Sequence, residues 1–218
     1  MNRLLIILFL FLATGIRAQR YEFREAPFLQ DWQHIGTPDS TKYAWCRGCL
    51  RLYGGVFDLN EGKDFTFTGL PLPDSPFTYE TKLTIIDTFD GDEAGICLYR
   101  SREAYVQCCV NDYRGDRRMK LRLQLVSHRL LLNDVSIGTV RTVWIRVSLS
   151  KTGDKYNFHY STDHQKWQWL QSVELRLLSP AATGSDSAML IGLYCFTGNS
   201  KFNAGYTYAD FEYVDFQK

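Results

Sequence analysis

Apolar and polar side chains alternate along residues 155–170, which read KYNFHYSTDHQKWQWL. Tyr156, Phe158 and Tyr160 fall on one side of an extended chain and the residues between them on the other, a period of two that is typical of a half-buried β-strand. The Ser, Thr and Asp at 161–163 have side chains that bond nearby backbone groups in turns. The segment therefore predicts an aromatic-rich hairpin, which needs a second sheet to pack against.

The same alternation recurs through the chain, and no stretch shows a sustained helical period. Residues 119–125 place Met and Leu inward and Lys, Arg and Gln outward, and residues 143–149 place Val, Ile and Leu inward. Short strands separated by regular turn signals predict an all-β sandwich or barrel. We expect strands at 50–53, about 65–67, 77–85, 94–100, 104–111, 119–126, 143–149, 156–160, 167–170, 188–196 and 208–216.

The first 18 residues have the pattern of a secretory signal peptide. Arg3 gives a basic start, residues 4–13 are apolar, and residues 16–18 offer a cleavage site before Gln19. The apolar run is too short for a membrane span, and no later run is long enough. We expect a secreted or periplasmic protein with a signal peptide at 1–18 and one domain at 19–218. The lack of any N-x-S/T acceptor sequence favours a bacterial source.

The charge balance excludes one class of partner. Lys plus Arg number 25 and Asp plus Glu number 24, so no overall field attracts nucleic acid or an anionic membrane. The aromatic share of 15% favours strands, and in an exported protein it also supplies flat rings for stacking on sugars.

The six cysteines permit disulfides in an oxidising compartment, but their pairing cannot be read from the sequence. Cys46 and Cys49 form a C-x-x-C pair without the second ligand pair of a zinc site, so a local disulfide or two thiols are expected. Cys97 and Cys108 would lie opposite each other if the turn between their strands centres on residues 102–103. They would then form a disulfide or be two core residues.

Seven segments carry, by their order, a resemblance to a known family. They are LQDWQHIGTPD (29–39), W-x-x-x-x-L-R-L-Y-G (45–54), FTYETKL (77–83), EAGICLYR (93–100), FHYSTDHQKW (158–167), IGLYCFTGN (191–199) and YADFEYVDF (208–216). The chain resembles the C-terminal concanavalin A-like β-sandwich of the β-xylosidases and arabinofuranosidases of glycoside hydrolase family 43. The resemblance implies a two-sheet antiparallel jelly roll and a role in carbohydrate metabolism.

The sequence departs from that family at two points. The family's catalytic residues lie in a five-bladed propeller that precedes the module, and a chain of 218 residues has no room for one. The paired arginines that often follow the second motif are absent, because residues 60–74 read NEGKDFTFTGLPLPD. That loop helps the family's module to face its propeller, so the resemblance does not extend to a propeller contact through this loop.

Catalysis by a carboxylate pair is not indicated. Jelly-roll glycosidases commonly carry E-x-D-x-x-E on one strand face, so that two acids flank the scissile bond. Here Glu80 stands alone on its strand beside Lys82, and neither a nucleophile elbow nor a spaced set of histidines is present. A non-catalytic module is favoured, and a small glycoside hydrolase or lyase on the same scaffold is the alternative.

Residues 87–93 hold four carboxylates, an oxygen-rich loop that suits calcium in exported proteins. Asp87, Asp90 and Asp92 are its candidate ligands. Asp210 and Glu25 are further candidates, by analogy with jelly rolls that clamp their two ends with one ion. The alternative is a solvated acidic turn, because the spacing of an EF-hand is missing.

Sugar binding needs an aromatic face for the ring and planar polar groups for its hydroxyls. Trp144 and Arg146 point away from the apolar stripe of their strand, and other outward residues join them if their strands adjoin in one sheet. The alternative is an ordinary solvated sheet face. Trp32, Trp45, Trp167 and Trp169 are expected to pack in the core or the hairpin. The candidate carbohydrate-binding residues are Trp144, Arg146, Arg122, Gln124, Glu80, Asn157 and His159.

We therefore expect an exported jelly roll that binds a glycan or a glycan-degrading enzyme, with no required cofactor and Ca²⁺ as an optional ligand. A small glycan-active enzyme would instead show a deep cleft with two carboxylates. A structural or assembly module would show a large exposed apolar patch.

Overall fold

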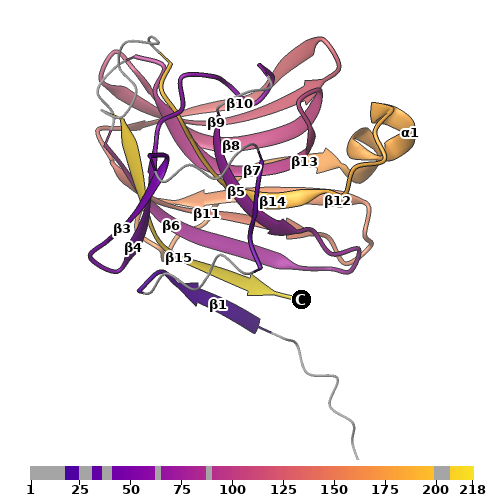
Figure 1. Ribbon diagram of the computed structural model, residues 1–218, viewed down its shortest axis with the longest axis horizontal. Helices are drawn as coiled ribbons and strands as arrows, with labels where there is room; N and C mark the ends of the chain where they lie inside the picture. Colours follow the sequence, from indigo (N-terminus) through magenta and orange to yellow (C-terminus); the bar gives the residue numbers. More distant parts are fainter. Residues whose placement is uncertain (1–17, 25–30, 36–40, 62–64, 87–89, 199–206) are drawn as a thin grey trace, which may run out of the picture.

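The computed structural model describes residues 18–24, 31–35, 41–61, 65–86, 90–198 and 207–218. These residues form two antiparallel sheets packed face to face (Figure 1), which confirms the predicted concanavalin A-like sandwich. The predicted signal peptide lies outside this description, apart from Ala18. Among the described residues, no helix is long and apolar enough to cross a membrane.

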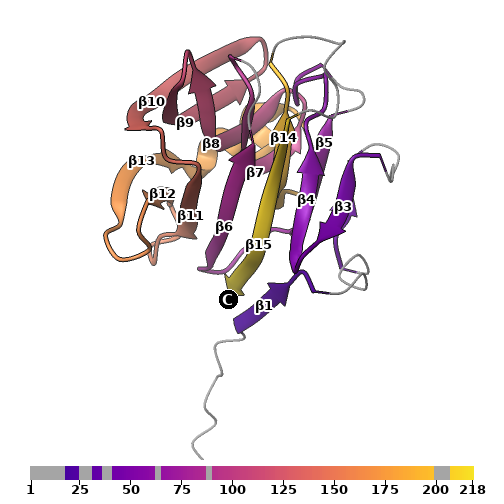
Figure 2. The ribbon, with the colours of Figure 1, turned by 90° about the vertical axis from the view of Figure 1, so that its left-hand side faces the viewer.

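Sheet A has eight strands. In order across the sheet, seven of them are β13 (Gln168–Glu174), β12 (Lys155–Ser161), β11 (Thr142–Leu149), β6 (Thr78–Ile86), β15 (Tyr208–Gln217), β4 (Cys49–Tyr53) and β3 (Tyr43–Cys46). The eighth, β1 (Ala18–Glu22), pairs with the second half of β15. Figure 2 shows β15, the last strand in sequence, lying between β6 and β4.

Sheet B has seven strands. In order, they are β10 (His128–Gly138), β9 (Asp116–Leu125), β8 (Ala104–Tyr113), β7 (Glu93–Ser101), β14 (Leu190–Phe196), β5 (Thr66–Pro71) and β2 (Gln33–His34). Between β13 and β14 the chain makes a 3₁₀ turn (Leu175–Leu178) and the single-turn helix α1 (Pro180–Thr183), which lies beside β12 and β13 in Figure 1.

Alternation along each strand decides which side chains fill the space between the sheets. On β6, Tyr79, Leu83 and Ile85 are fully buried, whereas the residues with the opposite parity are half-buried. The same holds on β11, where Val143 and Val147 face the core. Burial of this apolar surface, worth about 25 cal/mol per Å², is the main force that holds the two sheets together.

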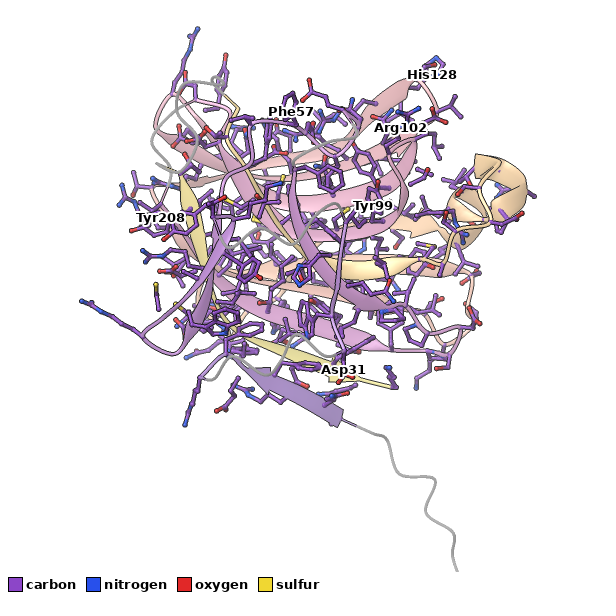
Figure 3. All side chains as sticks on the ribbon, viewed as in Figure 1. Asp31, Phe57, Tyr99, Arg102, His128 and Tyr208 are labelled. Carbon is purple, nitrogen blue, oxygen red and sulfur yellow. The ribbon has the colours of Figure 1, made fainter. Side chains whose placement is uncertain are left out.

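A second apolar cluster covers the outer face of sheet B. Cys97, Tyr99, Tyr105 and Cys109 alternate along β7 and β8 with residues of the main core, and Leu59 packs with them from the loop before β5. Tyr99 is labelled in Figure 3. Because both faces of these strands are buried, β7 and β8 are shielded from solvent along most of their length.

The sequence predicted the edge strand β13 but failed to predict the other strands at the sheet edges. β10 is an edge strand whose residues 128–131 are exposed, and its three consecutive leucines at 130–132 break the period of two. Edge strands have only one neighbour, so their burial pattern is weak. The short strands β1, β2 and β3 were likewise absent from the prediction.

The prediction that Cys97 and Cys108 lie opposite each other is wrong. Cys97 pairs with Gln107 and Cys108 with Ile96, so one thiol faces the outer cluster and the other the main core. The turn does centre on residues 102–103, because Ser101 pairs with Ala104, but a bulge between Tyr99 and Ser101 shifts the register by one residue and so separates the two cysteines.

All six cysteines are free thiols in the structure. Cys46 and Cys49 are register partners across a two-residue turn, and the Cys49 thiol donates to the carbonyl oxygen of Cys46 at 2.6 Å. Burial, the largest cause, raises the pKa of the Cys49 thiol to about 11. Cys49 is therefore a protonated hydrogen-bond donor at neutral pH.

Candidate carbohydrate-binding face

A line of directly opposed side chains crosses the outer face of sheet A. Glu80 on β6 is paired on one side with Arg146 on β11 and on the other with Asp215 on β15. Arg146 is paired in turn with His159 on β12, and His159 with Trp169 on β13. Since neighbouring strands lie about 4.8 Å apart, these five residues, here called the polar row, span roughly 19 Å.

Glu80 is the centre of a hydrogen-bonded network. Its carboxylate accepts two bonds from Arg146, at 3.0 and 2.7 Å, and one from the hydroxyl of Tyr213 at 2.8 Å. His164 Nε2 lies 2.9 Å from the same carboxylate. Burial alone would raise the pKa of Glu80, but the hydrogen bonds from Arg146, Tyr213 and His164 outweigh it and lower the pKa. Glu80 is therefore ionised at neutral pH.

Three tryptophans lie on or beside this face. The ring of Trp144 stacks on that of His164, with centroids 5.1 Å apart and planes 7° from parallel. The guanidinium of Arg146 lies 3.7 Å from the ring centroid of Trp167. Trp169 is 58% exposed, so the expectation that it packs in the hairpin is wrong. Neighbours cover part of Trp144 and Trp167, whereas Trp169 offers an open ring.

The turn at 162–166 positions His164. The side chain of Asp163 accepts hydrogen bonds from two backbone N–H groups of the turn, both at 2.8 Å. His164 itself has a φ of 61°, which is uncommon for a residue other than glycine. The turn thereby brings the imidazole back over the sheet and onto Trp144.

A cavity of about 610 Å³ lies along the polar row. Burial, followed by the charge of Arg146, lowers the pKa of His159, so its imidazole is neutral at neutral pH. The Nδ1 atom of His159 is buried and has no hydrogen-bond partner among the described residues. Planar polar groups beside an aromatic ring match the hydroxyls and the apolar face of a sugar. The lining residues are Thr78, Glu80, Arg146, Ser148, His159, Trp167, Asp215 and Gln217.

Five of the seven predicted residues lie in sheet A, namely Glu80, Trp144, Arg146, Asn157 and His159. Arg122 and Gln124 lie on β9 in sheet B, so the expectation that their strand adjoins the others is wrong. There, Arg122 pairs with the buried carboxylate of Glu93 at 2.5 Å. Alternation reveals which side chains point outward, but not to which sheet a strand belongs.

Sequence reasoning missed Asp215. Counting by twos from Asp210 along β15 puts Asp215 on the inner face, but a bulge between Phe211 and Tyr213 shifts the parity. The apolar residues on either side of Asp215, Val214 and Phe216, are both buried, and they are the signal that could have revealed its orientation.

Asp92, a predicted calcium ligand, has a different set of partners in the structure. Its buried carboxylate accepts hydrogen bonds from the Thr197 hydroxyl at 2.9 Å, from the Gly198 N–H at 3.1 Å and from the Thr207 hydroxyl. These bonds tie the start of β7 to the end of β14 and to the residue before β15.

The other predicted calcium ligands do not gather around Asp92. Asp210 forms a two-pronged ion pair with Arg51, at 2.7 and 2.8 Å, and Asp90 accepts a backbone N–H of the β8–β9 turn at 2.7 Å. Within the described ranges, no three His, Cys, Asp or Glu side chains form a group that could hold a metal ion. Calcium binding stays a prediction. Asp87 and Glu25 lie outside the described residues.

Comparison with protein families gives a match over nearly the whole described chain. Residues 20–217 match the family described as the β-xylosidase C-terminal concanavalin A-like domain. No match was found among curated proteins.

Solved structures share this fold at low sequence identity. The xyloglucan PUL protein GH43B of Bacteroides ovatus has a TM-score of 0.82 and 20% identity, over 90% of this chain and 38% of its own. A xylan β-1,4-xylosidase from Bacillus halodurans has a TM-score of 0.78 and 15% identity, over 91% of this chain and 39% of its own. A functionally unknown protein from Saccharomyces cerevisiae has a TM-score of 0.56 and 17% identity, over 86% of this chain and 92% of its own. The chain thus spans less than two fifths of the two bacterial proteins, and these likenesses concern the fold.

Proposed function

Because this chain belongs to the family of β-xylosidase C-terminal concanavalin A-like domains, we propose that it binds a glycan on the outer face of sheet A and does not cleave it. One observation carries the proposal. In the polar row, the exposed ring of Trp169 continues a line of planar polar groups that borders a cavity of about 610 Å³. Sugar sites in proteins combine the same two kinds of group.

The network around Glu80 prepares the face for a ligand. Two hydrogen bonds from Arg146 to Glu80 fix the guanidinium over Trp167 before any ligand arrives. Groups that are already ordered lose little conformational entropy on binding. A sugar ring stacked on Trp169 would place its neighbours within reach of His159 and Arg146.

The lowered pKa of Glu80 argues against Glu80 as the general acid of a hydrolase. Glu80 and Asp215 are opposed on adjacent strands, and a pair of carboxylates is what a glycosidase uses. One member of such a pair must be protonated to act as the general acid, which requires a raised pKa. The pKa of Glu80 is lowered instead. Glu80 therefore serves better as the acceptor that orients Arg146.

Calorimetric titration with oligosaccharides tests the proposal. Fragments of xylan and xyloglucan are the first ligands to use, because solved relatives carry those names. We expect Trp169→Ala to weaken binding by about tenfold, because the stacking surface is lost. The matched control is Tyr113→Ala, which removes a ring that is 52% exposed on β8 of sheet B and should leave the affinity unchanged. Full affinity in Trp169→Ala would contradict the proposed face.

Export is part of the same proposal. The basic start, apolar run and small residue before Gln19 support a signal peptide at residues 1–18. Expression of the full chain in a bacterium, followed by N-terminal sequencing of the exported protein, should give Gln19 as the first residue. Retention of Met1 in the cytoplasm would contradict export.

Docking onto a glycan-degrading enzyme is the second candidate function. Val126, Leu130 and Leu131 are 55%, 47% and 56% exposed at the β9–β10 edge of sheet B. An edge strand with exposed apolar side chains is a surface on which another chain can pair. Size-exclusion chromatography with a family 43 propeller domain would show a complex, and Leu131→Lys should abolish it.

A further inference from the structure

The cavity along the polar row carries an excess of negative charge. Its lining holds two carboxylates, those of Glu80 and Asp215, and one guanidinium, that of Arg146. Arg146 and Glu80 neutralise each other at 2.7 Å. Within the described part of the chain, the hydrogen bonds that Asp215 accepts from a side chain come from the Gln217 amide, at 3.4 Å. The carboxylate of Asp215 therefore faces the cavity with its acceptor capacity unfilled.

The cations next to the row have partners of their own. Lys82 on β6 lies 2.6 Å from Glu212. Arg20 is paired with Asp215 in the register of β1 and β15, but its guanidinium lies 4.1 Å from the ring centroid of Tyr213 and 3.4 Å from Glu22, which also pairs with Arg24. A ligand with a negative charge would therefore enter a cavity in which Asp215 is, among the described residues, the carboxylate that forms no ion pair.

We propose that the polar row binds an extended chain of uncharged sugars and disfavours sugars that carry a carboxylate, and that Asp215 sets this selectivity. The inference rests on the proposed glycan binding. Asp215 and Trp169 stand at the two ends of the row, so the chain lies across the strands with its rings between them. Asp215 accepts hydrogen bonds from sugar hydroxyls and repels the carboxylate of a uronic acid.

Two ligands of nearly the same shape, which differ in one charge, test whether the charge of the ligand affects its affinity. One is a xylo-oligosaccharide with a glucuronic acid branch, and the other is the same molecule after reduction of its carboxyl group to a primary alcohol. At low ionic strength, we expect the protein to bind the reduced ligand about fivefold more tightly, the effect of one like-charge contact near a protein surface. Asp215→Asn should bring the two affinities within about twofold of each other. Added salt screens the repulsion, so it should also reduce the difference between the two affinities in the unchanged protein.

A charge-matched control variant is available. Asp186→Asn removes one carboxylate from the exposed turn before β14, away from the cavity lining, and should leave the preference for the reduced ligand intact. Equal affinities in the unchanged protein, or a preference that survives Asp215→Asn, would overturn the inference and leave glycan binding standing. Failure to bind either ligand would overturn the proposed function, and the inference with it.

Discussion

The imidazole of His164 lies flat against the indole of Trp144, and its Nε2 atom reaches the Glu80 carboxylate at 2.9 Å. The residue holds this position with a φ of 61°, in a region that costs residues other than glycine about 1 kcal/mol. Arg47, Arg114 and Val126 have similar positive φ values in other turns, so the position of His164 is notable for its contacts with Trp144 and Glu80. Here the strain directs a ring onto the edge of the polar row, where it covers Trp144.

Two substitutions of His164 separate the strain from the contacts. His164→Gly and His164→Ala both remove the imidazole, but only glycine adopts a positive φ without cost. We expect the glycine variant to be more stable than the alanine variant by about 1 kcal/mol. Urea unfolding of the two variants side by side measures the difference. Equal stabilities would mean that the backbone at this position is not strained.

Glu80 should make part of the stability depend on pH. Its pKa is lower in the folded protein than the usual value of 4.5, so the folded state favours the ionised form. Such a group stabilises the fold above its unfolded pKa, and that stabilisation is lost as pH falls through the folded pKa.

The matched variant for this prediction is Glu80→Gln. The difference in unfolding free energy between the unchanged protein and the variant should be largest at neutral pH and should become smaller below about pH 4.5. Denaturant unfolding at several pH values would reveal the trend. A difference that stays constant down to about pH 3 would argue against an ionised Glu80 as the source.

The cysteines of β7 and β8 should stay unlinked in the exported protein. Cys97 and Cys108 point to opposite faces of sheet B, so their thiols cannot meet without a change of register. Alkylation after unfolding without reductant, followed by peptide mass spectrometry, should find both residues modified. A peptide pair linked through these two residues would refute the register.

Removing the charge of Glu93 should destabilise the protein strongly. Glu93 is 1% exposed and pairs with Arg122 at 2.5 Å under the second apolar cluster. Glu93→Gln leaves a mostly buried guanidinium without its counter-charge, and we expect a loss of about 3 kcal/mol. Asp116→Asn breaks the more exposed pair with Arg118 and should cost much less, because solvent screens that pair. Comparable losses in chemical unfolding would mean that Glu93 is more solvated than the structure indicates.

The alternation of apolar and polar side chains predicts a strand well where one face of the strand is buried and the other is exposed to solvent. The ranges predicted at 77–85 and 143–149 match β6 and β11 to within one residue at each end, and the range 119–126 falls on β9, which begins three residues earlier. It fails for β10, because an edge strand with exposed leucines carries no such contrast. The local pattern therefore predicts the inner strands and β13, but not the other edge strands.

The candidate site shows a second limit. Arg122 and Arg146 occupy equivalent outward positions on alternating strands, and nothing local assigns them to different sheets. Sheet membership depends on pairing between segments far apart in sequence, and the bulge in β15 reverses the parity that would have exposed Asp215. Glu80, Trp144, Arg146 and His159 could be predicted because their own strands indicate their orientation.

The position of β15 in sheet A has a consequence for how the protein is made. β6 and β4 are synthesised early, yet neither has its partner on that side until β15 follows more than a hundred residues later. Such long-range pairing slows folding. Until β15 pairs, β6 and β4 expose edges on which other chains can associate. Asp215 joins the polar row only when β15 pairs with β6. A chain in which β15 has not yet paired would therefore lack one end of the proposed binding face.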